Sequence, residues 1–247
     1  MAKVIGIIMT YNCAPMVEKT YCRLQKDVFD QIILVDDGST DDIKGVAERL
    51  GIPFFPHPHT GYGGNIKYGL RQALQLGADI MVEIHGDGQF DPTIAKVGVE
   101  KMKSGYDFVM GSRFTDLRQP LRDGMSKARY FANIGLSFFD RLVLRIPLTE
   151  YHGGFRVYSR HLLETVGFDH TSDDYLYSFE IIAQAAYHRL PVAEIPMRAN
   201  YHQAHTSISL RKATIYSFQT FGVLFKFVIA RLGLRTGLFS GSVARKV

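Results

Sequence analysis

The sequence predicts a doubly wound α/β domain, in which helices cover both faces of a mainly parallel sheet. Short apolar runs alternate with helix-like segments through the first half of the 247 residues, as in successive strand–helix–strand units. Several runs are apolar at every position, which is typical of parallel strands buried on both faces. No internal repeat and no linker rich in Pro, Gly or Ser divides the chain, so we expect one domain.

The expected strands are apolar runs that end at glycine or polar residues. They cover 4–9, 31–35, 52–55, 80–84 and 108–111, and a further β-like segment covers 192–197. Helices are expected at about 15–26, 42–50, 93–103, 130–144 and 177–188, and after the glycine-rich loop 60–65 as far as about 76. Pro15 suits a first helical turn, and Asp41 or Asp42 suits an N-cap. The polar, basic segment 113–129 is expected to be a mobile active-site loop.

Composition narrows the class of protein. Hydrophobic residues make up 46% and charged residues 21%, which excludes a disordered, collagen-like or coiled-coil chain. The formal net charge of +5 suits an anionic partner, such as a nucleotide, a phospholipid surface or a phosphorylated acceptor. The basic residues are too dispersed to indicate nucleic acid binding.

The cysteine count and the apolar runs favour the cytoplasm. Only two cysteines occur, so no disulfide framework is expected and a reducing compartment is the natural setting. The run 4–9 is short and has no small-residue cleavage site, which indicates a strand rather than a signal peptide. No 18 uninterrupted apolar residues occur, so we predict no transmembrane helix.

Polar residues follow several expected strands, where doubly wound sheets bind their ligands. Five of them are Asp36, Asp37, His85, Asp87 and Arg113. Asp36 and Asp37 can accept hydrogen bonds from a base N–H or a ribose hydroxyl. The alternative is a simple turn before a helix, for which Asp41 alone would supply the N-cap.

The segment His85-Gly-Asp87-Gly-Gln89 predicts a metal site. Hard oxygen ligands suit Mg²⁺ or Mn²⁺, and such ions share their coordination with substrate phosphates. His85 favours Mn²⁺, which tolerates imidazole better. The alternative is a glycine-rich turn with one capping Asp.

An ordered set of motifs carries a resemblance to a known family. The motifs are Thr10-Tyr11-Asn12, Asp36-Asp37-Gly-Ser-Thr-Asp41, His85-Gly-Asp87-Gly-Gln89, Gly111-Ser112-Arg113-Phe114 and Glu150-Tyr-His152-Gly-Gly-Phe-Arg156. Together they resemble inverting family 2 glycosyltransferases with a GT-A fold, close to the dolichyl-phosphate mannose and glucose synthase group. The resemblance spans about 4–210, so residues 1–210 are expected to form the glycosyltransferase domain, followed by a helical segment and tail at 211–247.

The resemblance implies a donor side and a metal site. Asp36 and Asp37 would hold the base and ribose of a nucleotide-diphospho-sugar. The other nucleotide-binding residues would be Thr10, Tyr11, Asn12, Gly64 and Lys67. Asp87, with Gln89 and His85, would bind Mg²⁺ or Mn²⁺, and Arg113 and Arg156 would face phosphate groups.

The chain departs from the family pattern at two positions. That group usually carries an acid where His85 stands and often a Glu where Cys13 stands. The first departure affects which metal the site would bind and whether the enzyme depends on one. The second favours UDP slightly over GDP as the nucleotide of the donor.

The chemistry of the acceptor decides whether a base is needed. A lipid phosphate is already ionised, whereas a hydroxyl must lose its proton to a carboxylate, for which Asp173 and Asp174 are the best candidates. The alternative role for these two acids is an N-cap of the next helix. Further phosphate or acceptor candidates, implied by the resemblance, are Glu150, His152, His202, His205 and Ser207. Glu180 is expected to be structural.

The segment 213–230 is rich in aromatic residues and has basic flanks. Such an amphipathic helix suits a membrane interface, although it would equally suit packing on the domain or on a partner subunit. The function predicted from these observations is transfer of a hexose to polyprenyl phosphate with inversion. The alternatives are transfer to a glycan hydroxyl and a non-catalytic nucleotide-binding module.

Overall fold

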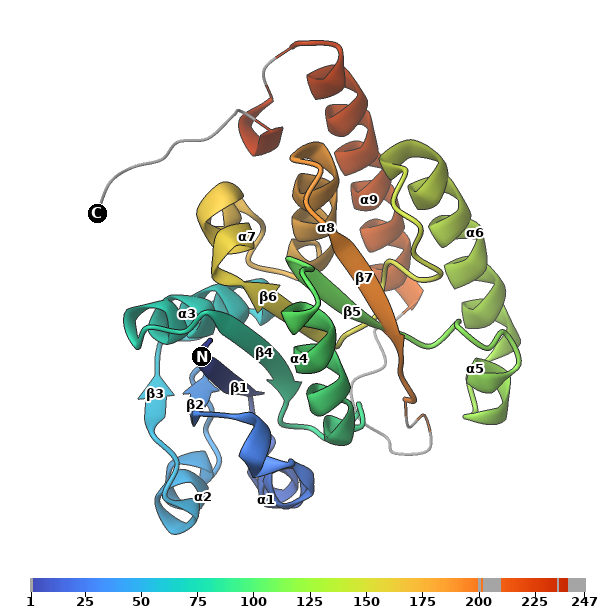
Figure 1. The fold of residues 1–247 in the computed structure, drawn as a ribbon. Coiled ribbons are helices and arrows are strands. Elements are labelled where there is room, and N and C mark those ends of the chain that lie inside the picture. The colour runs from blue at the N-terminus through green and yellow to red at the C-terminus, as the bar shows by residue number, and fades with distance from the viewer. Residues whose placement is uncertain (1, 200, 202–209, 235, 240–247) are drawn as a thin grey trace.

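The computed structural model describes residues 2–199, 201, 210–234 and 236–239 (Figure 1). A seven-stranded sheet forms its centre, in the order β3-β2-β1-β4-β6-β5-β7. The strands are β1 (Val4–Thr10), β2 (Gln31–Asp36), β3 (Phe54–Pro56), β4 (Ile80–His85), β5 (Phe108–Ser112), β6 (Arg156–Ser159) and β7 (Val192–Pro196). Only β6 runs antiparallel to its neighbours, so the sheet is mainly parallel, as the sequence predicts.

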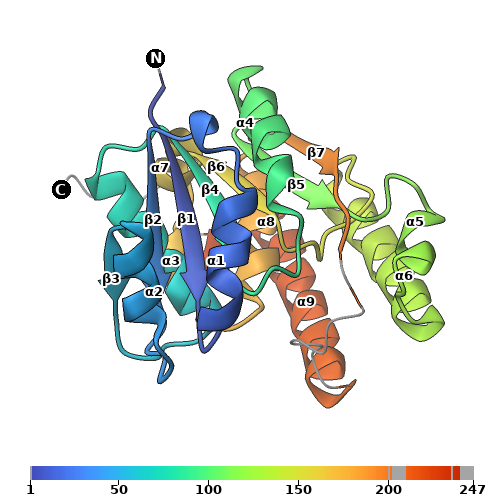
Figure 2. The same cartoon turned by 90° about the horizontal axis from the view of Figure 1, so that it is seen from below.

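Helices cover both faces of the sheet (Figures 1 and 2). The helices are α1 (Ala14–Arg23), α2 (Ile43–Leu50), α3 (Tyr62–Gln75), α4 (Ala95–Lys103), α5 (Gln119–Arg122), α6 (Lys127–Leu144), α7 (Arg160–Thr165), α8 (Tyr177–Tyr187) and α9 (Leu210–Arg231). Short 3₁₀ turns are η1 (Lys26–Val28), η2 (Pro92–Ile94), η3 (Phe168–His170) and η4 (Gly237–Phe239). One apolar core lies under α1, α2 and α4, and the other lies under α3, α7, α8 and α9.

Most expected elements are confirmed within a few residues, and the differences have local causes. The third strand is shifted to Phe54–Pro56, the residues that pair with β2. The helix expected from about 130 begins at Lys127, because the Ser126 hydroxyl accepts a hydrogen bond from the Arg129 amide. Asp42 precedes α2, but its side chain makes no cap hydrogen bond.

The C-terminal helix α9 bears on the expectation that no helix spans a membrane. Its part Arg211–Arg231 has a mean hydropathy of 1.4, which makes it long and apolar enough to cross a bilayer by length and composition alone. This criterion concerns length and composition alone, so the expectation that no helix spans a membrane stays a prediction. Helices in protein cores meet this criterion too, and α9 packs on α8 and α6 through a buried face that includes Val223, Leu224 and Phe227.

Candidate active site

The carboxyl ends of β1, β2 and β4 meet at one edge of the sheet. Thr10 pairs with Asp36 across β1 and β2, and Met9 pairs with His85 across β1 and β4. The motifs that follow β2 and β4 are therefore neighbours, as the sequence predicts. This edge is the candidate active site.

Asp36 and Asp37 hold the loops at this edge. The buried Asp36 carboxylate accepts hydrogen bonds from the Thr10 hydroxyl and the Ser39 amide, each at 2.9 Å. The buried Asp37 carboxylate accepts a hydrogen bond from the Thr60 amide at 2.7 Å. Both acids thus fix the backbone around a ligand position, and their contacts with base and ribose stay predictions.

Tyr11 provides an open aromatic surface beside these acids. Its ring is 51% exposed and stacks on His59, with 4.5 Å between ring centroids. His59 is held in turn by Asp37, whose Oδ2 lies 2.8 Å from His59 Nδ1. Asn12 has a φ of 48°, and its side-chain oxygen accepts a hydrogen bond from the Thr40 amide. The sequence singled out Tyr11 and Asn12 but missed His59, which only the fold brings to them.

His85 and Asp87 follow β4. His85 Nε2 lies 2.8 Å from the Gly154 carbonyl oxygen and 3.0 Å from Glu83 Oε1, so this nitrogen carries the proton between two acceptors. Burial by itself would lower the pKa of His85, but Glu83, and to a lesser degree Asp87, raise it above 6.5. Asp87 Oδ1 accepts a hydrogen bond from the Gln89 amide at 3.0 Å, which closes the turn after the strand.

The predicted metal site would need phosphate oxygens of the donor substrate to complete its coordination shell. Within the described residues, no group of three or more His, Cys, Asp or Glu side chains could hold an ion by itself. Mg²⁺ and Mn²⁺ commonly take one or two protein ligands and complete their shell with water and substrate phosphates. Asp87 supplies an oxygen ligand for a shared site of that kind, and His85 has only Nδ1 left for the ion, because its Nε2 is held by Glu83 and Gly154.

Beneath His85 lies a buried charge network that the sequence did not reveal. The Glu83 carboxylate accepts hydrogen bonds from the Tyr62 hydroxyl at 3.0 Å and from Arg156 Nη1 at 3.3 Å. Burial would raise the pKa of Glu83, but Arg156 and His85 lower it below its ordinary value. An acid inside the apolar run 80–84 was the available signal, because such residues are rarely buried without a partner.

Arg156 is consequently not where the sequence prediction put it. Its side chain is 1% exposed, and besides Glu83 it donates to the Gly153 carbonyl oxygen at 2.5 Å. The expectation that it faces a phosphate group is corrected, because its guanidinium balances Glu83 under the site.

Arg113 and Glu150 form a second buried pair, at the end of β5. Arg113 donates to Glu150 from its backbone amide at 2.7 Å and from Nε at 2.8 Å, and its Nη1 donates to the Tyr201 hydroxyl at 2.8 Å. Arg129, at the start of α6, lies over the Tyr201 ring at 5.4 Å. Burial and then the charge of Arg113 lower the pKa of Arg129, as expected for two guanidiniums that lie near each other on either side of Tyr201. The cluster carries one more positive charge than negative.

Arg129 is a functional candidate that sequence reasoning missed. It lay in the segment 113–129, whose several basic residues gave no reason to prefer one. That segment is anchored by the buried residues Phe114, Pro120 and Met125, which hold α5 and the start of α6 against the domain.

Lys67 belongs to a clamp between α3 and the segment 171–174. Its buried Nζ donates to the Thr171 carbonyl oxygen at 2.7 Å and lies 2.7 Å from Asp173 Oδ1. The Gly64 amide donates to the Asp173 carbonyl oxygen at 3.1 Å. Both residues were predicted to bind nucleotide, but here they hold the loop that carries Asp173 and Asp174.

Neither candidate base caps α8. The residue before α8 is Leu176, which has no side-chain cap, and Asp174 accepts a hydrogen bond from the next amide, Tyr175, at 2.8 Å. Tyr175 stacks on Tyr62 at 5.1 Å, and its pKa is raised by burial and then by Asp174 and Asp87. The loop thus extends toward the turn after β4.

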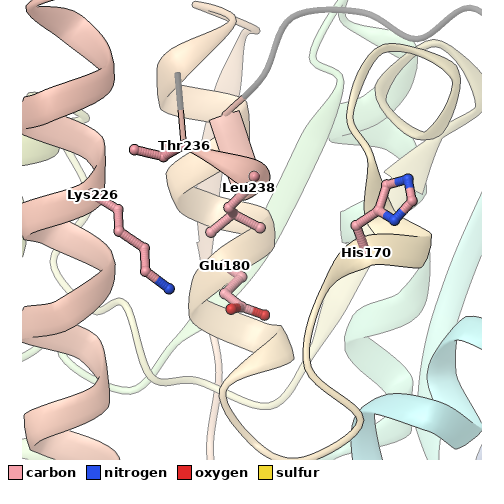
Figure 3. Close-up of a pocket in the computed structure, with 6 residues that line it drawn as sticks. His170, Glu180, Lys226, Thr236 and Leu238 are labelled. Carbon is pink, nitrogen blue, oxygen red and sulfur yellow. The ribbon is translucent and has the colours of Figure 1, made fainter. Parts of the chain in front are cut away.

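A cavity of about 560 Å³ lies behind this loop, between α8, α9, η3 and η4. Figure 3 shows Glu180 from α8 and Lys226 from α9 at its walls, with His170 opposite. Glu180 accepts a hydrogen bond from the Ser172 amide at 2.6 Å, and burial raises its pKa. It supports the 171–174 segment, in keeping with the structural role predicted for it.

His152 is enclosed rather than presented to a ligand. Its Nδ1 lies 2.9 Å from the Tyr216 hydroxyl, and its Nε2 lies 3.1 Å from Asp140 Oδ2. Its side chain is 7% exposed, so the predicted phosphate contact is corrected. The remaining candidates lie outside the described residues: His202, His205 and Ser207.

Comparison with known sequences agrees with this geometry. The pattern described as Glycosyl transferase family 2 matches residues 7–167, which contain the motifs after β1, β2, β4 and β5 and the Glu150–Arg156 segment. The chain belongs to glycosyl transferase family 2.

Relatives of this glycosyltransferase carry names that include polyprenyl phosphates. It is 27% identical over 246 residues to the UDP-N-acetylglucosamine–dolichyl-phosphate N-acetylglucosaminyltransferase of Methanococcus voltae, covering 92% of this chain and 95% of that protein. It is 27% identical over 174 residues to the undecaprenyl-phosphate mannosyltransferase of Micrococcus luteus, covering 68% and 70%. The resemblance to this group is confirmed.

A solved structure shows the same fold. Glucosyl-3-phosphoglycerate synthase from Mycobacterium tuberculosis, in complex with Mn²⁺, UDP and glucosyl-3-phosphoglycerate, matches with a TM-score of 0.68 at 16% identity, over 96% of this chain and 82% of that chain. The GT-A fold predicted for the glycosyltransferase is thereby confirmed.

Proposed function

We propose that this glycosyltransferase moves a hexose from a nucleotide-diphospho-sugar to polyprenyl phosphate, with inversion and with a divalent cation. The observation that supports a phosphate acceptor is the cluster in which Arg113 pairs with Glu150 and Arg129 lies over Tyr201, whose hydroxyl accepts a hydrogen bond from Arg113. A partly buried surplus of positive charge suits a phosphate, and guanidinium donors match its oxygens in pairs. The names of the relatives from Methanococcus voltae and Micrococcus luteus support this acceptor.

The residues at the ends of β1 and β2 support the proposed binding of the nucleotide-sugar donor. The open ring of Tyr11 can stack a base, beside the buried acids Asp36 and Asp37. UDP is favoured over GDP, in line with Cys13 after Asn12 and with the UDP bound in the M. tuberculosis synthase. That synthase binds Mn²⁺, or Mg²⁺ in another crystal, and Asp87 with His85 would hold such an ion here.

The mechanism follows from charge and from the positions of the two sites. A divalent cation, when bound, neutralises the negative charge that develops on the departing nucleotide diphosphate. Asp87 follows β4 and Arg113 follows β5, with β6 between the two strands. Donor and acceptor phosphates would thus be bound at different strand ends, which suits displacement from the face opposite the leaving group. An ionised phosphate oxygen needs no general base.

Substitution of residues near the proposed acceptor site tests this proposal. Arg129→Ala should lower kcat/KM for polyprenyl phosphate by about 10- to 100-fold, the range for one hydrogen bond to a charged group. Asp174→Asn should change it by less than about twofold. Arg49→Ala, which removes a 60% exposed guanidinium on α2, is the matched control. Unchanged turnover in Arg129→Ala with a large loss in Asp174→Asn would support transfer to a hydroxyl instead. Binding of UDP without transfer to either acceptor would support a nucleotide-binding module.

We further propose that α6 and α9 lie on the cytoplasmic face of a membrane. The two helices lie side by side (Figures 1 and 2), and Phe139 of α6 touches Phe221 of α9 at 6.0 Å between ring centroids. The most exposed apolar side chains of both helices include Phe131, Phe138, Phe218 and Phe225.

Charge favours an anionic bilayer over a second protein subunit. Apart from the buried Asp140, neither helix contains an acidic residue, whereas the two together contain seven Lys and Arg residues: Lys127, Arg129, Arg141, Arg211, Lys212, Lys226 and Arg231. Aromatic side chains among basic ones suit the headgroup region. Since α9 packs one face on α8, a position along the membrane surface suits it better than a transmembrane one.

The boundary expected at residue 210, between the glycosyltransferase domain and the C-terminal helical segment, stays a prediction.

Vesicle sedimentation tests this surface. Each exposed Phe that leaves water contributes about 1.5 kcal/mol or more, so Phe218→Glu with Phe225→Glu should weaken binding to phosphatidylglycerol vesicles by about 100-fold. Val97→Glu, at a 50% exposed apolar position on α4, is the control and should bind as the wild type does. Equal binding of both variants would exclude this face, and a monomer–dimer shift in the double variant would favour a subunit interface.

A further inference from the structure

Asp140, His152 and Tyr216 come from three separate parts of the chain and meet in the interior. Asp140 lies on α6, His152 lies in the segment before β6, and Tyr216 lies on α9. The imidazole bridges the other two: Nδ1 lies 2.9 Å from the Tyr216 hydroxyl and Nε2 lies 3.1 Å from Asp140 Oδ2. The ring also stacks on Phe179 of α8, with 5.8 Å between centroids and 25° between planes.

This imidazole contacts three helices, through Asp140 of α6, Phe179 of α8 and Tyr216 of α9. The Asp140 and His152 side chains are 2% and 7% exposed, and burial raises the pKa of Asp140 while His152 opposes that rise. Asp140 Oδ2 and His152 Nε2 make no hydrogen bond to any other described residue, so moving them apart would leave two buried polar atoms without a counterpart, which is costly. The three side chains therefore fix the relative positions of α6, α9 and the His152 backbone.

The His152 backbone is continuous with the cluster around Arg113. Glu150 lies two residues before His152 and accepts the hydrogen bonds of Arg113. The His152 carbonyl oxygen lies 3.5 Å from Arg113 Nη2. On the other side, α6 carries Arg129 at its start and Asp140 further along, so both ends of the cluster depend on how α6 is seated.

We infer that Asp140, His152 and Tyr216 form a joint that ties α6 and α9 to the Arg113–Glu150 pair, so that the seating of α9 sets the position of the acceptor-phosphate site. The joint acts through other residues and touches no substrate, so its members are positioning residues. This inference rests on the proposed function for the identity of the acceptor. It makes α9 part of the support of the reaction site as well as a candidate surface helix.

Tyr216→Phe is the sharpest test, because it removes one hydroxyl and keeps the ring. Loss of one hydrogen bond should raise KM for polyprenyl phosphate by about two- to tenfold and leave the affinity for UDP unchanged. Tyr187→Phe is the matched control, since Tyr187 of α8 also packs on α9, against Phe227, but within the described part of the chain makes no hydrogen bond or ring contact with Asp140, His152 or Tyr216. It should leave both constants unchanged.

Hydrogen–deuterium exchange gives a readout that needs no acceptor. In Tyr216→Phe the amides of 148–153 should exchange about two- to tenfold faster than in the wild type, and those of α1 and α2 should not change. His152→Asn should accelerate exchange at 148–153 more than Tyr216→Phe does. Equal exchange at 148–153 in Tyr216→Phe and Tyr187→Phe would overturn the joint. If the wild type lacks transfer to polyprenyl phosphate, the proposed function fails, while exchange at 148–153 still decides whether the joint exists.

Discussion

Gly63 lies where α3 meets the loop of the two candidate bases, and replacing it by alanine should separate these elements. A Cβ at this position would lie 2.5 Å from the Ser172 carbonyl oxygen and 2.8 Å from that of Asp174. Backbone oxygens cannot rotate away as a flexible side chain can. The loop must therefore retreat by at least the 0.5 Å that separates 2.5 Å from a tolerable 3.0 Å contact.

The magnitude follows from two opposing effects. Overpacking of this kind costs about 1–3 kcal/mol, whereas alanine in place of a helical glycine returns at most about 1 kcal/mol. Gly135→Ala isolates the second effect, because Gly135 is an exposed position inside α6 with no atom within 4 Å of an added Cβ. The two variants should therefore differ in the free energy of unfolding by about 1–3 kcal/mol, with Gly135→Ala the more stable.

Urea denaturation and thermal scans of both variants measure this difference. For a chain of this size, each 1 kcal/mol corresponds to about 2–4 °C in Tm. Gly63→Ala should also lose transfer activity, since the clamp of Lys67 on Asp173 opens with the loop. Equal stability of Gly63→Ala and Gly135→Ala would refute the close packing of α3 on 172–174.

Two further predictions concern charges at the site. Glu83→Gln should cost about 3 kcal/mol in urea denaturation, because it leaves Arg156 buried without its counter-charge, and the double variant with Arg156→Met should recover part of that loss. Since Arg156 and His85 hold the pKa of Glu83 below 4.5 in the folded protein, the stabilisation is present above pH 4.5 and lost below it. The deficit of Glu83→Gln should accordingly shrink in acid, and a deficit independent of pH would argue against the pair. UDP at 100 times its Kd should stabilise the protein by about 2.7 kcal/mol, which a thermal shift detects. Asp87→Asn should abolish the part of this shift that depends on Mn²⁺, whereas Asp91→Asn should retain it.

The strands and their common edge were predictable because they rest on local patterns. Continuous apolar runs give buried parallel strands, and the polar residues after them fall at one edge whatever the details of packing. β6 escaped prediction, since it is four residues long and begins with a charged residue, Arg156. Its antiparallel direction is set by its partners β4 and β5 rather than by its own sequence.

The roles of individual Lys and Arg side chains were harder to predict. Arg156 and Lys67 carry the charge that a phosphate needs, and both lie close to the expected site. Each is instead buried against an acid that is distant in sequence, Glu83 for Arg156 and Asp173 for Lys67. Arg129 was passed over in the sequence, yet the fold places it over the ring of Tyr201, whose hydroxyl accepts a hydrogen bond from Arg113.

The sequence by itself determined the α/β fold class, the edge at which the site lies and the glycosyltransferase family, because these depend on periodicity and on motifs of a few consecutive residues. The tertiary structure decided which charged side chains face the site and which neutralise one another beneath it. The physical reason is that a guanidinium or carboxylate has the same chemistry in either role. Burial and the nearest counter-charge select between the roles, and both are supplied by segments distant in the sequence, 73 residues away in the case of Glu83 and Arg156.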